Sequence, residues 1–156
     1  MNTTQAEALR AILGSQSNAA VGTLHDGEPF VSMAPFAVMP GGKGFVIHVS
    51  GLAAHTKDMR QHPNVSLLVM ATPTPDIQPQ AHSRVTIQCN AVQLADEDPA
   101  YPAARTSYLG RFPEAEMTMA LGDFSLFLLT PLAVRLVGGF AQAASLTPLN
   151  LEQALA

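Results

Sequence analysis

The chain of 156 residues suits one domain, and its hydrophobic residues (47%) far outnumber its charged residues (13%). Soluble domains average roughly 25% charged residues, so we expect much of the surface to be buried against a second copy of the chain, in a homodimer. The net charge of −4 excludes a nucleic-acid partner, which needs a basic surface, and no apolar run approaches the roughly 18 residues that span a bilayer.

The first half of the chain predicts a helix followed by a meander of strands. Residues 1–10 are polar and lack the apolar segment of a signal peptide. Thr4 and Glu7 have capping-box spacing and predict the start of a helix, and Gly14, which follows an apolar stripe, predicts its end. Pro35 indicates an edge position or a bulge in the second strand. Two turns, at Asp26-Gly27 and at 40–44, separate the three expected strands, which are 19–24, 30–39 and 45–50.

The second half begins with a change of period, which predicts a short helix over 51–61 that ends at His62-Pro63. The apolar run at 65–71 predicts a strand buried on both faces, and the proline-rich segment 72–81 predicts a loop. The other expected elements are a strand at 84–94, a helical segment at 99–121 broken near Pro113, strands at 125–130 and 133–137 around Pro131, a sheet end at Gly138-Gly139, and a weak helix or frayed tail at 146–156.

About seven short strands joined by tight turns predict a mainly β, antiparallel fold with short helices, in one domain over 1–156 with its core at about 5–145. A closed or nearly closed barrel explains the pattern best, because closure removes exposed strand edges. Cys89 lies between Ile87 and Ala91 on the apolar face of its strand, which predicts an inert core residue. As the single cysteine it excludes an intrachain disulfide and fits a reducing, cytoplasmic compartment.

The segment 49–57 carries the clearest candidate binding chemistry. It runs from a strand end through a glycine into a helix start, where free backbone N–H groups and the helix dipole attract an anion. Ser50 and Thr56 add hydroxyls, His55 adds a further donor, and Lys57 adds a positive charge. These residues predict a phosphate cradle; the alternative is a capped helix with a solvated lysine.

Other polar residues are weaker candidates. Arg84 opens the strand at 84–94 on its polar face, where it can reach a phosphate or a cofactor carbonyl, or remain solvated. His48, His55 and His62 recur every seven residues, which is not the close pairing of zinc ligands, so we expect no metal site.

Several stretches resemble, in order, the motifs of the flavin-binding split-barrel family related to pyridoxamine-phosphate oxidase. The segment 50–56, Ser-Gly-Leu-Ala-Ala-His-Thr, is similar to the signature of one branch, the haem-utilisation proteins. The other resembling stretches are 21–24, 26–27 and 29–32 in the opening hairpin, 63–69 and 84–87 in the next strands, and 123–126 and 137–143 near the end.

The resemblance implies a split β-barrel that forms a homodimer and holds two FMN molecules at the dimer interface. It places the flavin phosphate at the turn from the third strand into the helix, with help from the second strand and from the strand that carries Arg84. The cofactor-binding residues expected from the resemblance and the local chemistry are Ser32, Met33, Val49, Ser50, Gly51, Leu52, His55, Thr56, Lys57 and Arg84.

The chain departs from true pyridoxamine-phosphate oxidases in its charges. Residues 31–34 contain no basic residue where those oxidases are often basic, and the whole chain has eight Lys plus Arg. With Lys57 and Arg84 assigned to the flavin, no close basic pair remains near the site for a second phosphate. We therefore expect reduced flavin affinity and no efficient oxidation of pyridoxamine phosphate.

The leading hypothesis is an FMN-binding protein, and a flavin-dependent oxidoreductase in which the flavin performs the redox step. The sequence identifies neither its substrate nor a catalytic residue. The alternative is a haem-binding, haem-utilisation protein on the same barrel without flavin. Longer members of that branch carry an extra C-terminal domain or a haem-ligating histidine near the end, whereas His82 is the last histidine here. A third reading is a dimeric barrel whose cofactor site has decayed.

Overall fold

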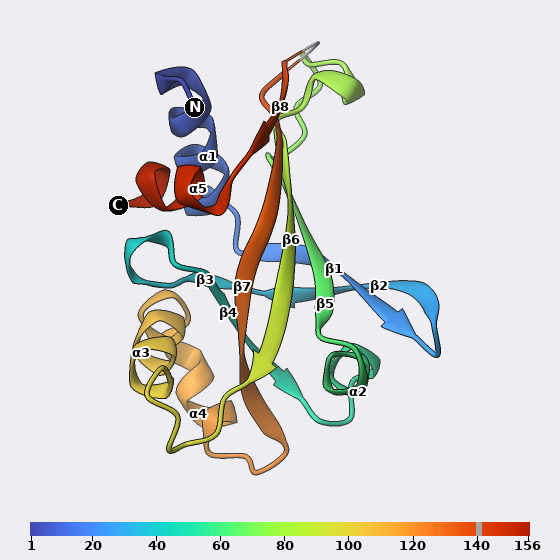
Figure 1. Ribbon diagram of the computed structural model, residues 1–156, viewed down its shortest axis with the longest axis vertical. Coiled ribbons are helices and arrows are strands. Elements are labelled where there is room, and N and C mark those ends of the chain that lie inside the picture. The colour runs from blue at the N-terminus through green and yellow to red at the C-terminus, as the bar shows by residue number, and fades with distance from the viewer. Residues whose placement is uncertain (140–141) are drawn as a thin grey trace.

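The computed structural model describes residues 1–139 and 142–156, and Figure 1 shows a long curled sheet with helices at both ends. The strands are β1 (Asn18–His25), β2 (Glu28–Pro35), β3 (Ala37–Val38), β4 (Phe45–Ser50), β5 (Asn64–Met70), β6 (Arg84–Gln93), β7 (Phe124–Val137) and β8 (Ala143–Leu146). The α-helices are α1 (Thr3–Ser15), α2 (Ala54–Gln61), α3 (Tyr101–Arg111), α4 (Glu116–Met119) and α5 (Pro148–Leu155). Single 3₁₀ turns lie at Pro40–Gly42, Pro79–Ala81 and Pro113–Ala115.

Every strand pair in the described part of the chain is antiparallel. The order across the sheet is β2-β1-β5-β6-β7-β4-β3, and β8 pairs with β7. The sheet curls around a core, with α1 and α5 side by side near the two termini and α3 and α4 at the opposite end (Figure 1). This half-barrel, mainly β with short helices, confirms the split-barrel expectation.

The inner face of the curled sheet forms the core through strict alternation. On β6, Val85, Ile87, Cys89 and Ala91 are all buried, as the sequence predicts. Burial raises the pKa of the Cys89 thiol to about 12, which fits the inert core residue expected from its neighbours.

The helical ends follow local signals, with one shift. The capping box of α1 is formed by Asn2 and Gln5, two residues before the expected pair of Thr4 and Glu7, and the helix begins at Thr3. At the other terminus, Thr147 and Asn150 cap α5, and Pro148 stands in its first turn. Leu151 is fully buried against the core, so of the two expected alternatives, a weak helix or a frayed tail, the structure shows the helix, and α5 is anchored.

Three expectations about strands are wrong. Leu68 and Met70 are 39% and 42% exposed, so β5 is buried on one face only. The expected pair of strands around Pro131 is one continuous strand, because a bulge in β7 opposite Gln88 and Cys89 leaves Leu132 as an extra residue beside the proline, which cannot donate to the ladder. Gly138-Gly139 does not end the sheet, since β8 returns and pairs with β7. Residues 140–141 of the expected closing motif lie outside the described residues.

The outer sheet face, defined here by the exposed apolar side chains of Val31, Met33, Leu68, Met70 and Leu132, remains uncovered in the single chain. The ladder register puts small residues between them: Val31 pairs with Gly22, which pairs with Ser66. The described residues contain no helix long and apolar enough to cross a membrane.

Candidate functional site

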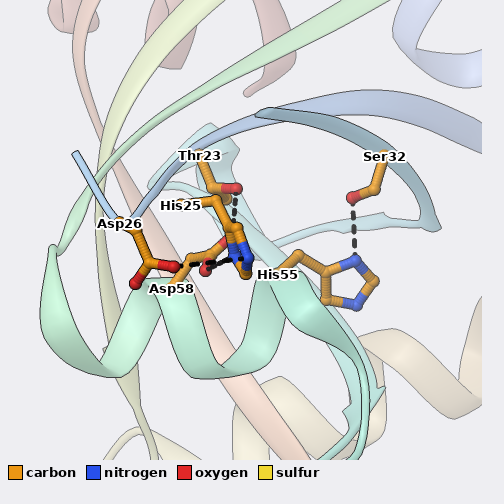
Figure 2. A network of polar contacts seen from close by, with 6 residues as sticks. All are labelled: Thr23, His25, Asp26, Ser32, His55 and Asp58. Carbon is orange, nitrogen blue, oxygen red and sulfur yellow. Dashed lines mark hydrogen bonds and ion pairs between the residues drawn. The ribbon is translucent and has the colours of Figure 1, made fainter. Parts of the chain in front are cut away.

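The β1–β2 hairpin and α2 enclose a group of polar side chains (Figure 2). The hairpin turn is formed by Asp26 and Gly27, both with positive φ, as expected for an Asp-Gly turn. Thr23 and His25 of β1 and Ser32 of β2 face the helix, and α2 presents His55 and Asp58 toward them. His55 and Asp58 are three residues apart, so they share one face of α2.

Asp58 is the centre of this group. Its side chain is buried, and the residue is only 2% exposed. The Thr23 hydroxyl donates to one carboxylate oxygen at 2.7 Å, and Nδ1 of His25 lies 2.7 Å from the other. Burial raises the pKa of Asp58, but the hydrogen bonds from Thr23 and His25 outweigh it and hold that pKa below its ordinary value. The site therefore holds a buried carboxylate anion.

His25 is the exposed partner of this carboxylate. Its hydrogen bond to Asp58, together with the charge of Asp58, raises the pKa of His25 above the ordinary value. The side chain is 48% exposed, and its ring packs against Phe30 with the ring centroids 5.4 Å apart. Asp26 stands 3.8 Å from Nε2, too far for a hydrogen bond.

His55 forms a second pair, with its Nδ1 2.8 Å from the Ser32 hydroxyl. Burial lowers the pKa of His55, and the charge of Asp58 partly opposes that effect. The neutral imidazole is therefore the favoured form, and the site combines one basic and one less basic imidazole beside a buried carboxylate.

The expected phosphate cradle lies at the turn into α2, and many of its hydrogen-bonding groups already have partners within the chain. The Ser50 hydroxyl donates to the Asp123 carboxylate at 3.0 Å, and the Thr56 hydroxyl donates to the Ser50 carbonyl at 2.6 Å. The N–H groups of Gly51 and Leu52 donate to the Asp123 carbonyl and to the Ser50 hydroxyl. Whether this turn binds a phosphate stays a prediction.

The structure brings some of the expected cofactor residues together and separates others. Ser32 and His55 meet across the hairpin and α2, whereas Met33 points to the outer sheet face with 58% exposure. Lys57 is exposed on α2, Leu52 is 80% exposed beside it, and Val49 is buried in the core.

Arg84 is remote from this turn within one chain. It pairs with Val137 at the end of β7, whereas Ser50 pairs with Phe124 at the start of the same strand. A strand of that length spans roughly 40 Å at about 3.3 Å per residue. The Arg84 guanidinium donates to the carbonyls of Gln80 and His82. A role for Arg84 in the cofactor site therefore requires a second copy of the chain.

No pattern in the sequence predicts Thr23, His25 or Asp58 as site residues. The one usable signal is the position of Asp58 next to Met59 on α2, where both side chains are buried. A buried carboxylate needs partners, but the sequence does not name them. Among the described residues, no cluster of three or more His, Cys, Asp or Glu side chains forms a metal site.

Comparison with known proteins gives the family. The family described as pyridoxamine 5'-phosphate oxidase matches residues 5–138. The chain belongs to that family. Two curated relatives place it in the haem-utilisation branch, as the motif at 50–56 suggests. It is 36% identical over 119 residues to the chloroplastic heme oxygenase HOZ of Arabidopsis thaliana, and 30% identical over 118 residues to the heme oxygenase HutZ of Vibrio cholerae.

The relatives are longer than this chain. The matches cover 76% and 75% of the chain but 35% of HOZ and 66% of HutZ. Among solved structures, a heme binding protein from Mycobacterium smegmatis aligns with a TM-score of 0.86 at 28% identity, over 98% of this chain and 62% of that protein. The shared part is thus the split barrel with its short helices.

Proposed function

We propose that this protein binds haem and serves in haem utilisation. The observation that carries the proposal is the 36% identity to HOZ, a heme oxygenase, over 76% of the chain. The same branch supplies HutZ, also named a heme oxygenase, and the structural neighbour from Mycobacterium smegmatis is titled a heme binding protein. These names favour haem over the flavin that the leading sequence hypothesis assigned.

The side chains at the hairpin and α2 fit haem by their donor chemistry. His25 and His55 offer imidazole nitrogens, which are common ligands of haem iron. Phe30 is 36% exposed next to His25 and offers an apolar contact for a porphyrin. Lys57 offers a positive charge for a propionate. Bound haem would supply an iron atom able to bind oxygen, while the protein supplies ligation, orientation and a hydrogen-bonded environment.

A homodimer is part of this proposal. The outer sheet face exposes Val31 (69%) and Met33 (58%), and the low charged content of the chain favours burial of this face against a second copy. Light scattering at micromolar concentration is expected to give twice the chain mass. A monomer at that concentration would contradict a cofactor site shared between two copies.

Flavin binding is the second candidate, because the family as a whole is named for a flavin-type oxidase. If the turn at 50–57 holds the FMN phosphate, Lys57→Ala weakens FMN binding more than Lys43→Ala, since Lys43 lies beyond a separate turn at Pro40–Gly42. Equal titration curves for the two variants would count against this cradle.

The absorption spectrum of the purified protein separates the two candidates. Titration of the protein with haem at micromolar concentration is expected to produce a shifted, saturable Soret band with one haem per site. Titration with FMN under the same conditions is expected to give weaker binding. Tight FMN binding together with no saturable haem binding would reverse the proposal.

A further inference from the structure

The five histidines differ sharply in what surrounds them, and all five lie among the described residues. His48 is 8% exposed, and its ring packs against the rings of Tyr108 and Phe124. His82 is 7% exposed, and His62 ends α2 on the surface. His55 pairs with the neutral hydroxyl of Ser32. Within the described residues, His25 alone combines an exposed ring with a buried carboxylate on one ring nitrogen.

That arrangement fixes the tautomer of His25. The Asp58 carboxylate is an acceptor, so a neutral His25 ring carries its proton on Nδ1 and donates it at 2.7 Å. The lone pair then lies on Nε2, the ring nitrogen that does not face Asp58, in a side chain that is 48% exposed. Ligating histidines in metalloproteins almost always donate their other N–H to a carboxylate, a carbonyl or water, which orients the ring and raises its basicity.

We propose that His25 would hold haem iron through Nε2, with Asp58 and Thr23 as positioning residues behind it. This inference rests on the proposed haem-binding function and adds a specific ligand to it. Thr23 holds one oxygen of Asp58, so the other oxygen is left for the His25 ring (Figure 2). Phe30 contacts the ring from β2 and limits its rotation.

Charge balance supports the same assignment. The buried Asp58 carries a negative charge whose hydrogen-bond partners are Thr23 and His25. A cation at Nε2 would lie one imidazole ring from that charge, and the N–H donated to Asp58 would gain imidazolate character. The Asp26 carboxylate pairs with Nε2 at 3.8 Å, and its side chain is 85% exposed, so it is free to turn into solvent when a cation binds there.

The test uses the haem-loaded full chain and reads the iron coordination rather than activity. Electronic absorption and electron paramagnetic resonance of the ferric form, and resonance Raman of the ferrous form, report a histidine ligand. His25→Gly is expected to lose the ferrous iron–histidine stretching band, and added imidazole is expected to restore it. His62→Gly, an exposed histidine at the end of α2, is the matched control and keeps the wild-type spectra.

Two further variants separate ligation from folding. His25→Gln removes the imidazole but keeps an N–H donor for Asp58, so it is expected to fold, to show the wild-type circular dichroism and to lack the histidine band. Asp58→Asn keeps the ligand but weakens its imidazolate character, which shifts the iron–histidine band to lower frequency. It is also expected to lower haem affinity by about 10–100-fold, as other carboxylate partners of ligating histidines do.

The outcomes are distinct. Wild-type protein that binds haem while His25→Gly and His25→Gln keep its histidine band would overturn the ligand assignment and leave the proposed function standing. An iron–histidine band unmoved by Asp58→Asn would overturn the positioning role of Asp58. Wild-type protein that binds no haem would overturn the proposed function and this ligand assignment with it.

Discussion

Replacement of Thr23 by valine tests the central energetic claim about the site. Valine has nearly the same shape as threonine but cannot donate to Asp58, and Thr23 is only 4% exposed, so water does not replace the lost donor. A hydrogen bond to a charged group contributes about 1.5–3 kcal/mol. We therefore expect Thr23→Val to lower the unfolding free energy of the haem-free protein by about that amount, and Tm by about 3–12 °C for a chain of this size.

The matched control is Thr118→Val, because the Thr118 hydroxyl donates at 2.9 Å to a neutral acceptor, the Ala115 carbonyl. It is expected to cost about 0.5–1.5 kcal/mol. Urea unfolding at pH 7 followed by circular dichroism measures both variants. In an Asp58→Asn background the acceptor is neutral, so the cost of Thr23→Val is expected to fall by at least about 1 kcal/mol. Equal costs for the two threonines, or no coupling with Asp58→Asn, would refute a buried charged Asp58.

Three further predictions concern the core. Gly44→Ala is expected to destabilise the protein by at least about 1 kcal/mol in urea unfolding, because φ of Gly44 is +145° and a Cβ would stand 2.8 Å from the Leu129 carbonyl oxygen. Gly122→Ala is the control, since a Cβ at Gly122 would have no neighbouring atom within 4 Å. Burial lowers the pKa of His48 below its ordinary value of 6.5, so as the pH falls His48 gains a proton in the unfolded chain before it does in the folded chain. The contribution of His48 to stability is therefore full above pH 6.5 and is lost as the pH falls. His48→Phe is expected to reduce this loss of unfolding free energy between pH 7 and 5. With a pKa of about 12, Cys89 is expected to resist iodoacetamide in the native state at neutral pH and to react in urea, and rapid native labelling would contradict its burial.

The sequence predicts much of the fold because its signals are local. The alternation from Arg84 onward defines β6 to within one residue at its end. Asp26-Gly27 gives the first hairpin, and Pro113 gives the break between α3 and α4. Each of these features depends on residues close together in the chain, where backbone geometry and side-chain period act directly.

The failures come from contacts between distant segments. Leu68 and Met70 are apolar, and their exposure depends on whether anything covers the outer sheet face, which no local period reveals. Pro131 stays inside a strand because β7 bulges at the next residue, Leu132, where its pairing with β6 shifts by one residue. Likewise, Asp58 is 33 residues from His25 and 35 from Thr23, so their contacts exist only after α2 packs under the hairpin.

The hydrogen bonds around α2 support the proposal of haem over a cofactor that carries a phosphate. At the turn into the helix, the hydroxyls of Ser50 and Thr56 donate within the chain, and the acceptor for Ser50 is the Asp123 carboxylate. One negative charge disfavours another, so the turn offers less to a phosphate than its sequence suggests. The inward face of α2 presents His55 in its first turn and the buried anion Asp58 one turn later, and His55 together with His25 of the hairpin offers imidazole nitrogens. Imidazoles supported by a carboxylate favour a metal over an anion, and this chemistry supports the proposed haem site between the inward face of α2 and the hairpin.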